Sequence, residues 1–134
     1  MRLEALCQEV VSPLPLPLVQ DSTGIWRSDW APLVPAMLDA NLAPDLRAAL
    51  FHATLAQALC EQALAVRTQT GVSRVGLSGG VFQNRVLTER TLAALGAAGF
   101  DVLIPERLPT NDAAISYGQL VEAAAVEARR TSAQ

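Results

Sequence analysis

Residues 76–84 of the chain, GLSGGVFQN, combine two kinds of group that could do chemistry. Gly76, Ser78 and Gly80 fit the G-x-S-x-G pattern that presents a serine nucleophile on a tight turn. Gly79 and Gly80 could instead hold a phosphate where the next predicted helix begins, with Asn84 adding an amide contact to a ribose or phosphate. A third interpretation is that the glycines only permit a tight turn.

A serine nucleophile requires a base within hydrogen-bonding reach. The single histidine, His52, precedes Ser78 and falls in the middle of a predicted helix, whereas in α/β-hydrolases the histidine follows the nucleophile. His52 stands among Phe51, Leu55 and Ala56, a setting that favours a hydrogen-bonded helix histidine over a metal ligand. These residues therefore give little support to a hydrolase.

A phosphate site requires fewer side chains than a catalytic serine does. Two glycines after a strand let the backbone approach an anion, and the first free N–H groups of the next helix point towards it. The chain has no lysine of the kind found in a Walker loop, and Gly79-Gly80 lacks the three-glycine spacing of a dinucleotide fold. On these residues the phosphate site and the plain turn both stay open.

Asn111 and Asp112 raise a parallel question at the next predicted helix start. Asn111 is a good N-cap and Asp112 a favourable first-turn charge, contributions of about 0.5–1 kcal/mol each. The functional interpretation is that Asp112 is a carboxylate ligand to a metal or to a magnesium nucleotide. The sequence leaves both interpretations open.

The elements around these two turns alternate between strand and helix. Because short loops join a strand, a crossover helix and a second strand, we expect the strands to be parallel. Both turns then lie at the carboxyl edge of one sheet, where ligands bind in open α/β folds. Two strands make a poor sheet, so either the N-terminal hairpin joins them or part of the sheet lies outside this chain. The predicted strands are 73–77 and 101–104, and the predicted helices are 81–98, which starts at Val81 or Phe82, and 112–128.

The N-terminal part is less regular. We expect one domain, or part of one, over residues 1–134, divided into an N-terminal region 1–42 and a region 43–134. In the first region, prolines at every second position of SPLPLPLVQ indicate extended chain. The expected elements are a short helix within 1–11, a hairpin at 18–20 and 25–26, a helix at 30–41, a long helix at 45–68 ended by Gly71, and a frayed tail at 129–134.

Composition excludes several classes of protein. The net charge is −3 and the arginines are scattered, which argues against nucleic acid as a partner. Cys7 and Cys60 are far apart and, with one histidine, are too few for a zinc site. The chain shows no secretion signal and no apolar run of about 18 residues, so we expect a cytoplasmic protein without a membrane partner.

Three stretches together resemble a known family. LSGGVFQNRVL at 77–87, LPTNDAAISYGQ at 108–119 and, more loosely, LFHATLAQAL at 50–59 are similar to the C-terminal part of the hydrogenase-maturation carbamoyltransferases, HypF. The resemblance implies a helix-rich half of an actin-like, ribonuclease-H-like ATPase fold, related to the Kae1 domain of the tRNA threonylcarbamoyltransferases. It therefore implies an α/β fold with a short parallel sheet and a small N-terminal hairpin.

The resemblance also implies an activity. HypF enzymes use carbamoyl phosphate and ATP, through carbamoyl adenylate, to carbamoylate the C-terminal cysteine of their partner HypE, which leads to the cyanide ligands of the nickel–iron centre. Carried over to this sequence, Ser78, Gly79, Gly80 and Asn84 would contact the nucleotide. Asp112 would bind a divalent metal, zinc or iron, beside ATP and magnesium.

The chain departs from the family in two ways. Thr110 stands where the family usually has a second proline, and Ala113 and Ala114 stand where it has two glycines. The family's metal-binding histidines come from a half of the domain that is not in this sequence. We therefore expect a fragment that carries part of a nucleotide site and needs the rest of a HypF-type enzyme to catalyse. On this resemblance ATP with magnesium and a divalent metal belong to the complete enzyme, and the sequence leaves open whether the fragment binds them alone. The alternative is a non-catalytic interaction module that forms a homodimer.

Overall fold

The structure, a computed structural model, describes residues 2–132 and confirms a helix-rich α/β fold. The chain forms two compact units, one made of the chain up to Gly76 with Asn84–Leu103, the other of Leu77–Gln83 with the chain from Ile104 onwards. The predicted boundary between residues 42 and 43 stays a prediction. The elements, in chain order, are α1 Arg2–Ala5, β1 Leu18–Gln20, β2 Trp26–Ser28, α2 Leu33–Leu38, α3 Pro44–Thr70, β3 Arg74–Gly76, the 3-10 turn η1 Gly80–Gln83, α4 Arg85–Ala97, β4 Asp101–Leu103, the 3-10 turn η2 Asp112–Ala114 and α5 Ile115–Ser132.

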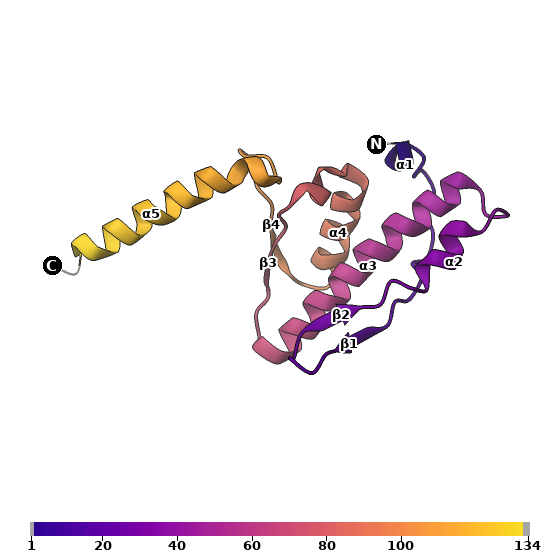
Figure 1. The fold of residues 1–134 in the computed structure, drawn as a ribbon, viewed down its shortest axis with the longest axis horizontal. Coiled ribbons are helices and arrows are strands. Elements are labelled where there is room, and N and C mark those ends of the chain that lie inside the picture. Colours follow the sequence, from indigo (N-terminus) through magenta and orange to yellow (C-terminus); the bar gives the residue numbers. More distant parts are fainter. Residues whose placement is uncertain (1, 133–134) are drawn as a thin grey trace. The chain divides into compact units, whose positions relative to one another are not determined.

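Helix α3 is the centre of the first unit and confirms the long helix predicted from the sequence. Pro44 occupies its first turn, where a missing N–H costs nothing. Gly71 ends it in the left-handed conformation, with φ 74° and its N–H bonded to the Arg67 carbonyl. Figure 1 shows α4 on one side of α3 and the β1–β2 hairpin on the other. The buried side chains of α3 are mostly small: Ala48, Ala49, His52, Ala53, Thr54, Ala56, Ala58 and Cys60.

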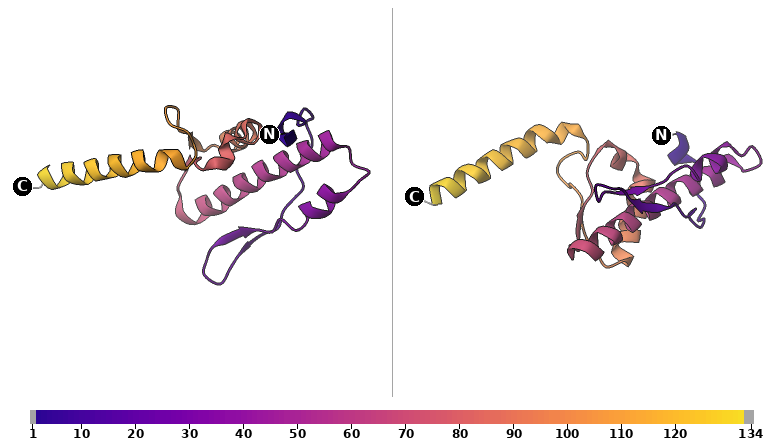
Figure 2. Two further views of the ribbon diagram at one scale, coloured as in Figure 1. Left: turned by 45° about the horizontal axis from the view of Figure 1, so that its top comes forward. Right: turned by 60° about the horizontal axis from the view of Figure 1, so that its bottom comes forward.

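The proline-rich arm packs against α3 as extended chain, as predicted. The Leu14 N–H donates to Thr54 Oγ1 at 2.9 Å, so a buried α3 hydroxyl satisfies a backbone group that no strand pairs with. Leu16 is buried in a small apolar cluster with Leu33 of α2 and Ala58 of α3. The arm is therefore part of the first unit's core. Figure 2 shows the same arrangement of arm, hairpin and α3 from two further directions.

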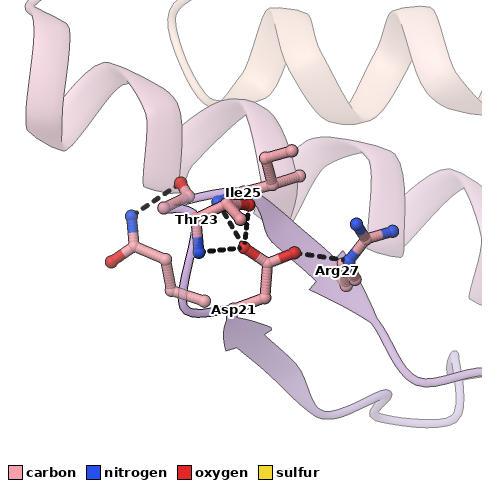
Figure 3. A network of polar contacts seen from close by, with 6 residues as sticks. Asp21, Thr23, Ile25 and Arg27 are labelled. Atoms are coloured by element: carbon pink, nitrogen blue, oxygen red, sulfur yellow. Dashed lines mark hydrogen bonds and ion pairs between the residues drawn. The ribbon is translucent and has the colours of Figure 1, made fainter.

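The predicted hairpin is confirmed, with β1 and β2 antiparallel and Leu18 opposite Ser28. Its second strand begins at Trp26, not at Ile25. Asp21 organises the turn (Figure 3): its Oδ1 accepts from the Thr23 N–H at 2.9 Å and the Ile25 N–H at 3.0 Å, and its Oδ2 from Arg27 Nε at 2.7 Å. Hydrogen bonds from the Thr23 hydroxyl and from Arg27 lower the pKa of Asp21 to about 2.

Strands β3 and β4 are parallel, as predicted, with Val75 opposite Val102. Arg74 Nε donates to Asp101 Oδ2 at 2.6 Å beside this pairing. The hairpin forms a sheet of its own and does not extend the β3–β4 pair. Of the two expected arrangements for completing the sheet, the structure therefore rules out the one in which the hairpin supplies the missing strands.

The predicted helix limits were wrong in several places. Residues 80–83 form a 3-10 turn, and α4 begins only at Arg85, because Asn84 caps it by accepting from the Leu87 N–H at 3.0 Å. Helix α5 begins at Ile115, after η2, and continues to Ser132, so the tail is helical well beyond residue 128. Residues 133–134 lie outside the described part of the chain. Helix α1 lies within the predicted range 1–11, and α2 is shorter than the predicted 30–41. No helix in residues 2–132 is long and apolar enough to cross a membrane.

Candidate functional site

The two turns singled out in the sequence meet in the second unit. The Gly79 N–H donates to the Thr110 carbonyl oxygen at 2.6 Å, a bond that joins segments 31 positions apart in the chain. Around this bond lies a pocket of about 290 Å³. The prediction that the two turns lie side by side is confirmed within the second unit. The pocket is lined by Ser78, Gly79, Thr110, Asn111, Asp112, Ala114 and Ile115.

The two glycines of the first turn have different structural explanations. Gly79 has φ 108°, a conformation that side chains with a Cβ adopt only under strain, so the turn itself requires glycine there. Gly80 is not among the glycines with positive φ. A Cβ on Gly80 would meet Asn111 Cβ at 3.9 Å, an ordinary contact. The fold therefore explains Gly79 but gives no reason for Gly80, whose missing side chain leaves backbone open beside the pocket.

The backbone of this first turn offers donors. The first hydrogen bond of η1 runs from the Phe82 N–H to the Gly79 carbonyl at 3.1 Å. The N–H groups of Gly80 and Val81 precede that bond, so neither has an acceptor within the turn. Ser78 is exposed and adds a hydroxyl to the pocket wall. These groups can contact an anion without moving the fold.

The second turn holds its acid at the start of η2. Asn111 Oδ1 accepts from the Ala113 N–H at 3.1 Å, and the Asn111 carbonyl accepts from the Ala114 N–H at 3.1 Å. The N-cap prediction for Asn111 is confirmed. Asp112 is exposed and lines the pocket, where its carboxylate can reach a cation. Within residues 2–132 no group of three or more His, Cys, Asp or Glu side chains gathers into a metal site, so its role as a metal ligand stays a prediction.

Comparison with known proteins shows which family this chain belongs to. The model of the carbamoyltransferase Kae1-like domain, second subdomain, matches residues 1–119. The chain belongs to this HypF family.

Carbamoyltransferase HypF of Synechocystis sp. is 39% identical over 103 residues, which cover 76% of this chain and 13% of that protein. HypF of Rhodobacter capsulatus is 37% identical over 126 residues, covering 93% of this chain and 16% of that protein. A crystal structure of full-length HypF in a phosphate- and nucleotide-bound form superposes with a TM-score of 0.84 at 29% identity, covering 92% of this chain and 17% of that one. A tRNA N6-adenosine threonylcarbamoyltransferase of Aromatoleum aromaticum is 36% identical over 121 residues, covering 84% of this chain and 35% of that protein. The chain thus spans less than a fifth of the length of these two HypF relatives.

The positions at which this HypF-family chain departs from the family's pattern are accommodated by the second turn. Thr110 holds Gly79 through its backbone carbonyl, a group that the usual proline also carries. No residue other than glycine has a positive φ in the described part of the chain, so Ala113 and Ala114 sit in η2 without backbone strain. Ala114 lines the pocket, where its methyl takes up space that a glycine would leave open.

Asn84 lies in the first unit of the HypF-family chain and is 8% exposed. Its Oδ1 accepts from the Leu87 N–H, and its Nδ2 lies 2.8 Å from Nε2 of the fully buried His52. His52 Nδ1 lies 2.7 Å from the Ala48 carbonyl, which can only accept, so the ring carries its proton on Nδ1 and takes the Asn84 amide proton on Nε2. Both ends of the Asn84 amide are therefore used inside the first unit, and its contact with a nucleotide stays a prediction.

The same contacts decide between the interpretations of His52. Both ring nitrogens are engaged with buried partners, which confirms the hydrogen-bonded helix histidine. His52 is the only histidine of the chain, so it cannot serve Ser78 as a base while these bonds exist. The structure thus removes the support for a catalytic serine.

Glu4 was missed by reasoning from the sequence. Its Oε1 accepts from the Arg85 N–H at 2.6 Å and from the Val86 N–H at 3.4 Å, the first two N–H groups of α4. Glu4 and Asn84 therefore satisfy the first N–H groups of α4, so the predicted phosphate contact at Gly79-Gly80 depends on the N–H groups of η1 and stays a prediction. Eighty-one positions separate Glu4 from Arg85, so no local sequence pattern could predict this contact.

Proposed function

We propose that this chain is the C-terminal segment of a HypF-type carbamoyltransferase and forms one wall of its nucleotide site. The observation that carries the proposal is the pocket around the Gly79–Thr110 bond, which is lined by both the glycine turn and the exposed acid Asp112. Gly80 adds to it, since the fold itself does not require glycine at that position. A backbone without Cβ atoms next to an acid suits a phosphate bound together with a metal ion.

Each residue of the pocket has a role in this proposal. The N–H groups of Gly80 and Val81 donate to phosphate oxygens, and the Ser78 hydroxyl adds a further donor. Asp112 supplies one carboxylate ligand to a divalent metal, magnesium with ATP or the zinc or iron of the family, and the remaining ligands come from the other parts of the enzyme. A metal bound there neutralises negative charge on the phosphate oxygens. Asn84 takes part only if its amide leaves His52.

The reaction follows from the family. The complete enzyme converts carbamoyl phosphate and ATP, through carbamoyl adenylate, into a carbamoyl group on the C-terminal cysteine of HypE during hydrogenase maturation in the cytoplasm. This chain by itself does not catalyse it, because a site built from two facing halves loses its preorganisation when one half is removed.

The test uses the isolated chain and a matched variant. Magnesium ATP should shift the backbone amide NMR signals of 78–81 and 111–115, and Asp112→Asn should remove these shifts. Asp45→Asn, which changes an exposed first-turn acid of α3 in the other unit, should leave them intact. Shifts that persist in Asp112→Asn would remove Asp112 from the site. Affinity tighter than low micromolar would contradict the half-site. In a complete HypF-type enzyme, Asp112→Ala should abolish metal-dependent transfer.

A second candidate function is an interaction module, and α5 is the observation that favours it. Tyr117, Leu120 and Val121 are all more than half exposed, and Leu120 is 70% exposed. Side chains three and four positions apart share one helix face, so these residues form an apolar stripe that a partner or a second copy could cover. Sedimentation equilibrium should then show a dimer that Leu120→Ser dissociates. A monomer at high concentration would exclude the homodimer.

A further inference from the structure

We infer that Asn111 is a positioning residue, which fixes the Asp112 carboxylate at a set place relative to the glycine turn. The inference rests on the proposed function, because it assigns a role towards a metal bound by Asp112. Asn111 itself touches neither metal nor phosphate in this account. It acts through the backbone that carries Asp112.

Hydrogen bonds hold the backbone on both sides of Asp112. Upstream, the Thr110 carbonyl accepts from the Gly79 N–H at 2.6 Å and anchors the residue before Asn111 to the glycine turn. Downstream, Asn111 accepts hydrogen bonds from the next two N–H groups. Its side-chain Oδ1 accepts from the Ala113 N–H and its backbone carbonyl from the Ala114 N–H, both at 3.1 Å. Asp112 lies between these anchors, and its own carbonyl accepts from the Ile115 N–H. The acid therefore has little freedom of backbone rotation while the Asn111 side chain is in place.

Asn111 also sets the spacing across the pocket. A Cβ built on Gly80 would lie 3.9 Å from Asn111 Cβ. Apart from Gly80 and its neighbours in the same turn, no other residue has a heavy atom within 4 Å of that point. The nearest neighbour of the open Gly80 backbone on this side is thus the residue that immediately precedes Asp112. Asp112 would hold a metal next to a phosphate on the glycine turn only if the distance between the two turns stayed constant.

Of the three positions that form the link, only Asn111 acts through its side chain. The Gly79–Thr110 bond is between backbone atoms and survives substitution of Thr110. The Asn111 cap depends on one side-chain oxygen, so Asn111→Ala removes it while keeping the Cβ that faces Gly80. Without the cap, the η2 turn samples other conformations, and the apparent affinity falls by the fraction of molecules that keep the competent one.

The experiment measures binding of Mn²⁺ to the whole chain by paramagnetic broadening of the amide signals of 110–116, which detects weak binding. Asn111→Ala should weaken the Mn²⁺ affinity about three- to fivefold. Asn111→Ser, which retains both a cap acceptor and the Cβ, should stay within about twofold of the unmodified chain. Asp112→Asn should remove the broadening.

The control is Asp29→Ala in the first unit, where Asp29 Oδ1 accepts from the Ala31 N–H at 2.9 Å in the same two-residue pattern. It removes an equivalent cap and should leave the broadening at 110–116 unchanged. Should Asn111→Ala unfold the second unit, Asn111→Gly, which helix starts tolerate well, removes the same side-chain acceptor together with the Cβ, and its Mn²⁺ affinity should fall at least as far.

The outcomes separate the two claims. The positioning role would be overturned if Asn111→Ala bound Mn²⁺ as tightly as the unmodified chain. It would also be overturned if Asn111→Ser lost as much Mn²⁺ affinity as Asn111→Ala. Either result would leave the metal site itself in place. Absence of any broadening around Asp112 in the unmodified chain would overturn the metal site and the positioning role together. A loss in Asn111→Ala that Asn111→Ser restores supports both.

Discussion

Replacing each of the two glycines of the first turn, Gly79 and Gly80, by alanine should have opposite effects on folding and on binding. At Gly79, φ is 108°, so Gly79→Ala forces a side chain into a backbone region that costs about 1–3 kcal/mol. No atom lies within 4 Å of the added methyl, so this cost is conformational and no steric clash adds to it. At Gly80 the methyl would make only an ordinary contact with Asn111 Cβ at 3.9 Å. Gly80→Ala should therefore change the free energy of unfolding by less than about 1 kcal/mol, and an increase is the expected sign because alanine restricts the unfolded chain.

Urea denaturation with unit-specific NMR probes measures this difference. The single tyrosine, Tyr117, reports on the second unit, and the indole N–H signals of Trp26 and Trp30 report on the first. Gly79→Ala should lower the midpoint at Tyr117 and leave the indole midpoints where they are. Gly80→Ala should leave the indole midpoints unchanged and keep or slightly raise the Tyr117 midpoint. It should weaken the response of 78–81 to magnesium ATP, since its methyl stands where a phosphate must approach the backbone. A Gly80→Ala chain that binds as well as the unmodified one, or a Gly79→Ala chain as stable as Gly80→Ala, would refute the assignment of conformational and ligand roles to the two glycines.

Three further predictions concern the first unit. The hydrogen bonds and ion pair of Asp21 lower its pKa from 3.8 to about 2. The carboxylate therefore stabilises the hairpin fully well above pH 3.8, and this stabilisation is lost as the pH falls through about 2. The amide chemical shifts of the hairpin should show this titration, and Asp21→Asn should abolish it. His52→Ala should lower the free energy of unfolding by about 2–4 kcal/mol in urea, because it opens a cavity in a fully buried site and leaves the Asn84 amide without its acceptor. Burial, with the charge of Glu61, raises the pKa of the Cys60 thiol, so iodoacetamide should modify Cys7 of the folded chain before Cys60, and mass spectrometry should find both modified in urea.

The meeting of the two turns could be predicted from the sequence because it depends on a general rule of chain connectivity. Two short strands joined by one helix pair in parallel, and this rule predicts that the turns that follow the two strands are neighbours. Helix α3 was equally predictable, since its alanine and leucine periodicity is long and Gly71 ends it. These features need only local patterns and one topological rule.

The start of α4 could not be predicted because contacts distant in the sequence decide it. Val81 and Phe82 have the spacing of a helix, yet the helix begins at Arg85. Asn84 is fixed as its cap by His52, 32 positions earlier, and Glu4 fills the next donors from the N-terminal segment. Periodicity identifies a helix reliably, but the residue at which it begins depends on which side chains reach its free N–H groups.

The charge of the pocket leads to a last prediction, that nucleotide binding by this chain requires a divalent metal. The seven residues that line the pocket include one acid, Asp112, and no lysine, arginine or histidine. The first N–H groups of α4 are not available to compensate, because Glu4 and Asn84 hold them. Two unit charges of the same sign 4 Å apart repel by about 1 kcal/mol in water and about 4 kcal/mol at an effective dielectric constant near 20, and the phosphates of ATP carry several such charges. ATP with EDTA should therefore leave the signals of 78–81 unchanged at concentrations at which magnesium ATP shifts them. In Asp112→Asn, which removes the repelling charge together with the ligand, metal-free ATP should bind no worse than to the unmodified chain. Metal-free ATP binding as strong as that of magnesium ATP would show that the glycine turn alone suffices and that Asp112 plays no part in holding the nucleotide.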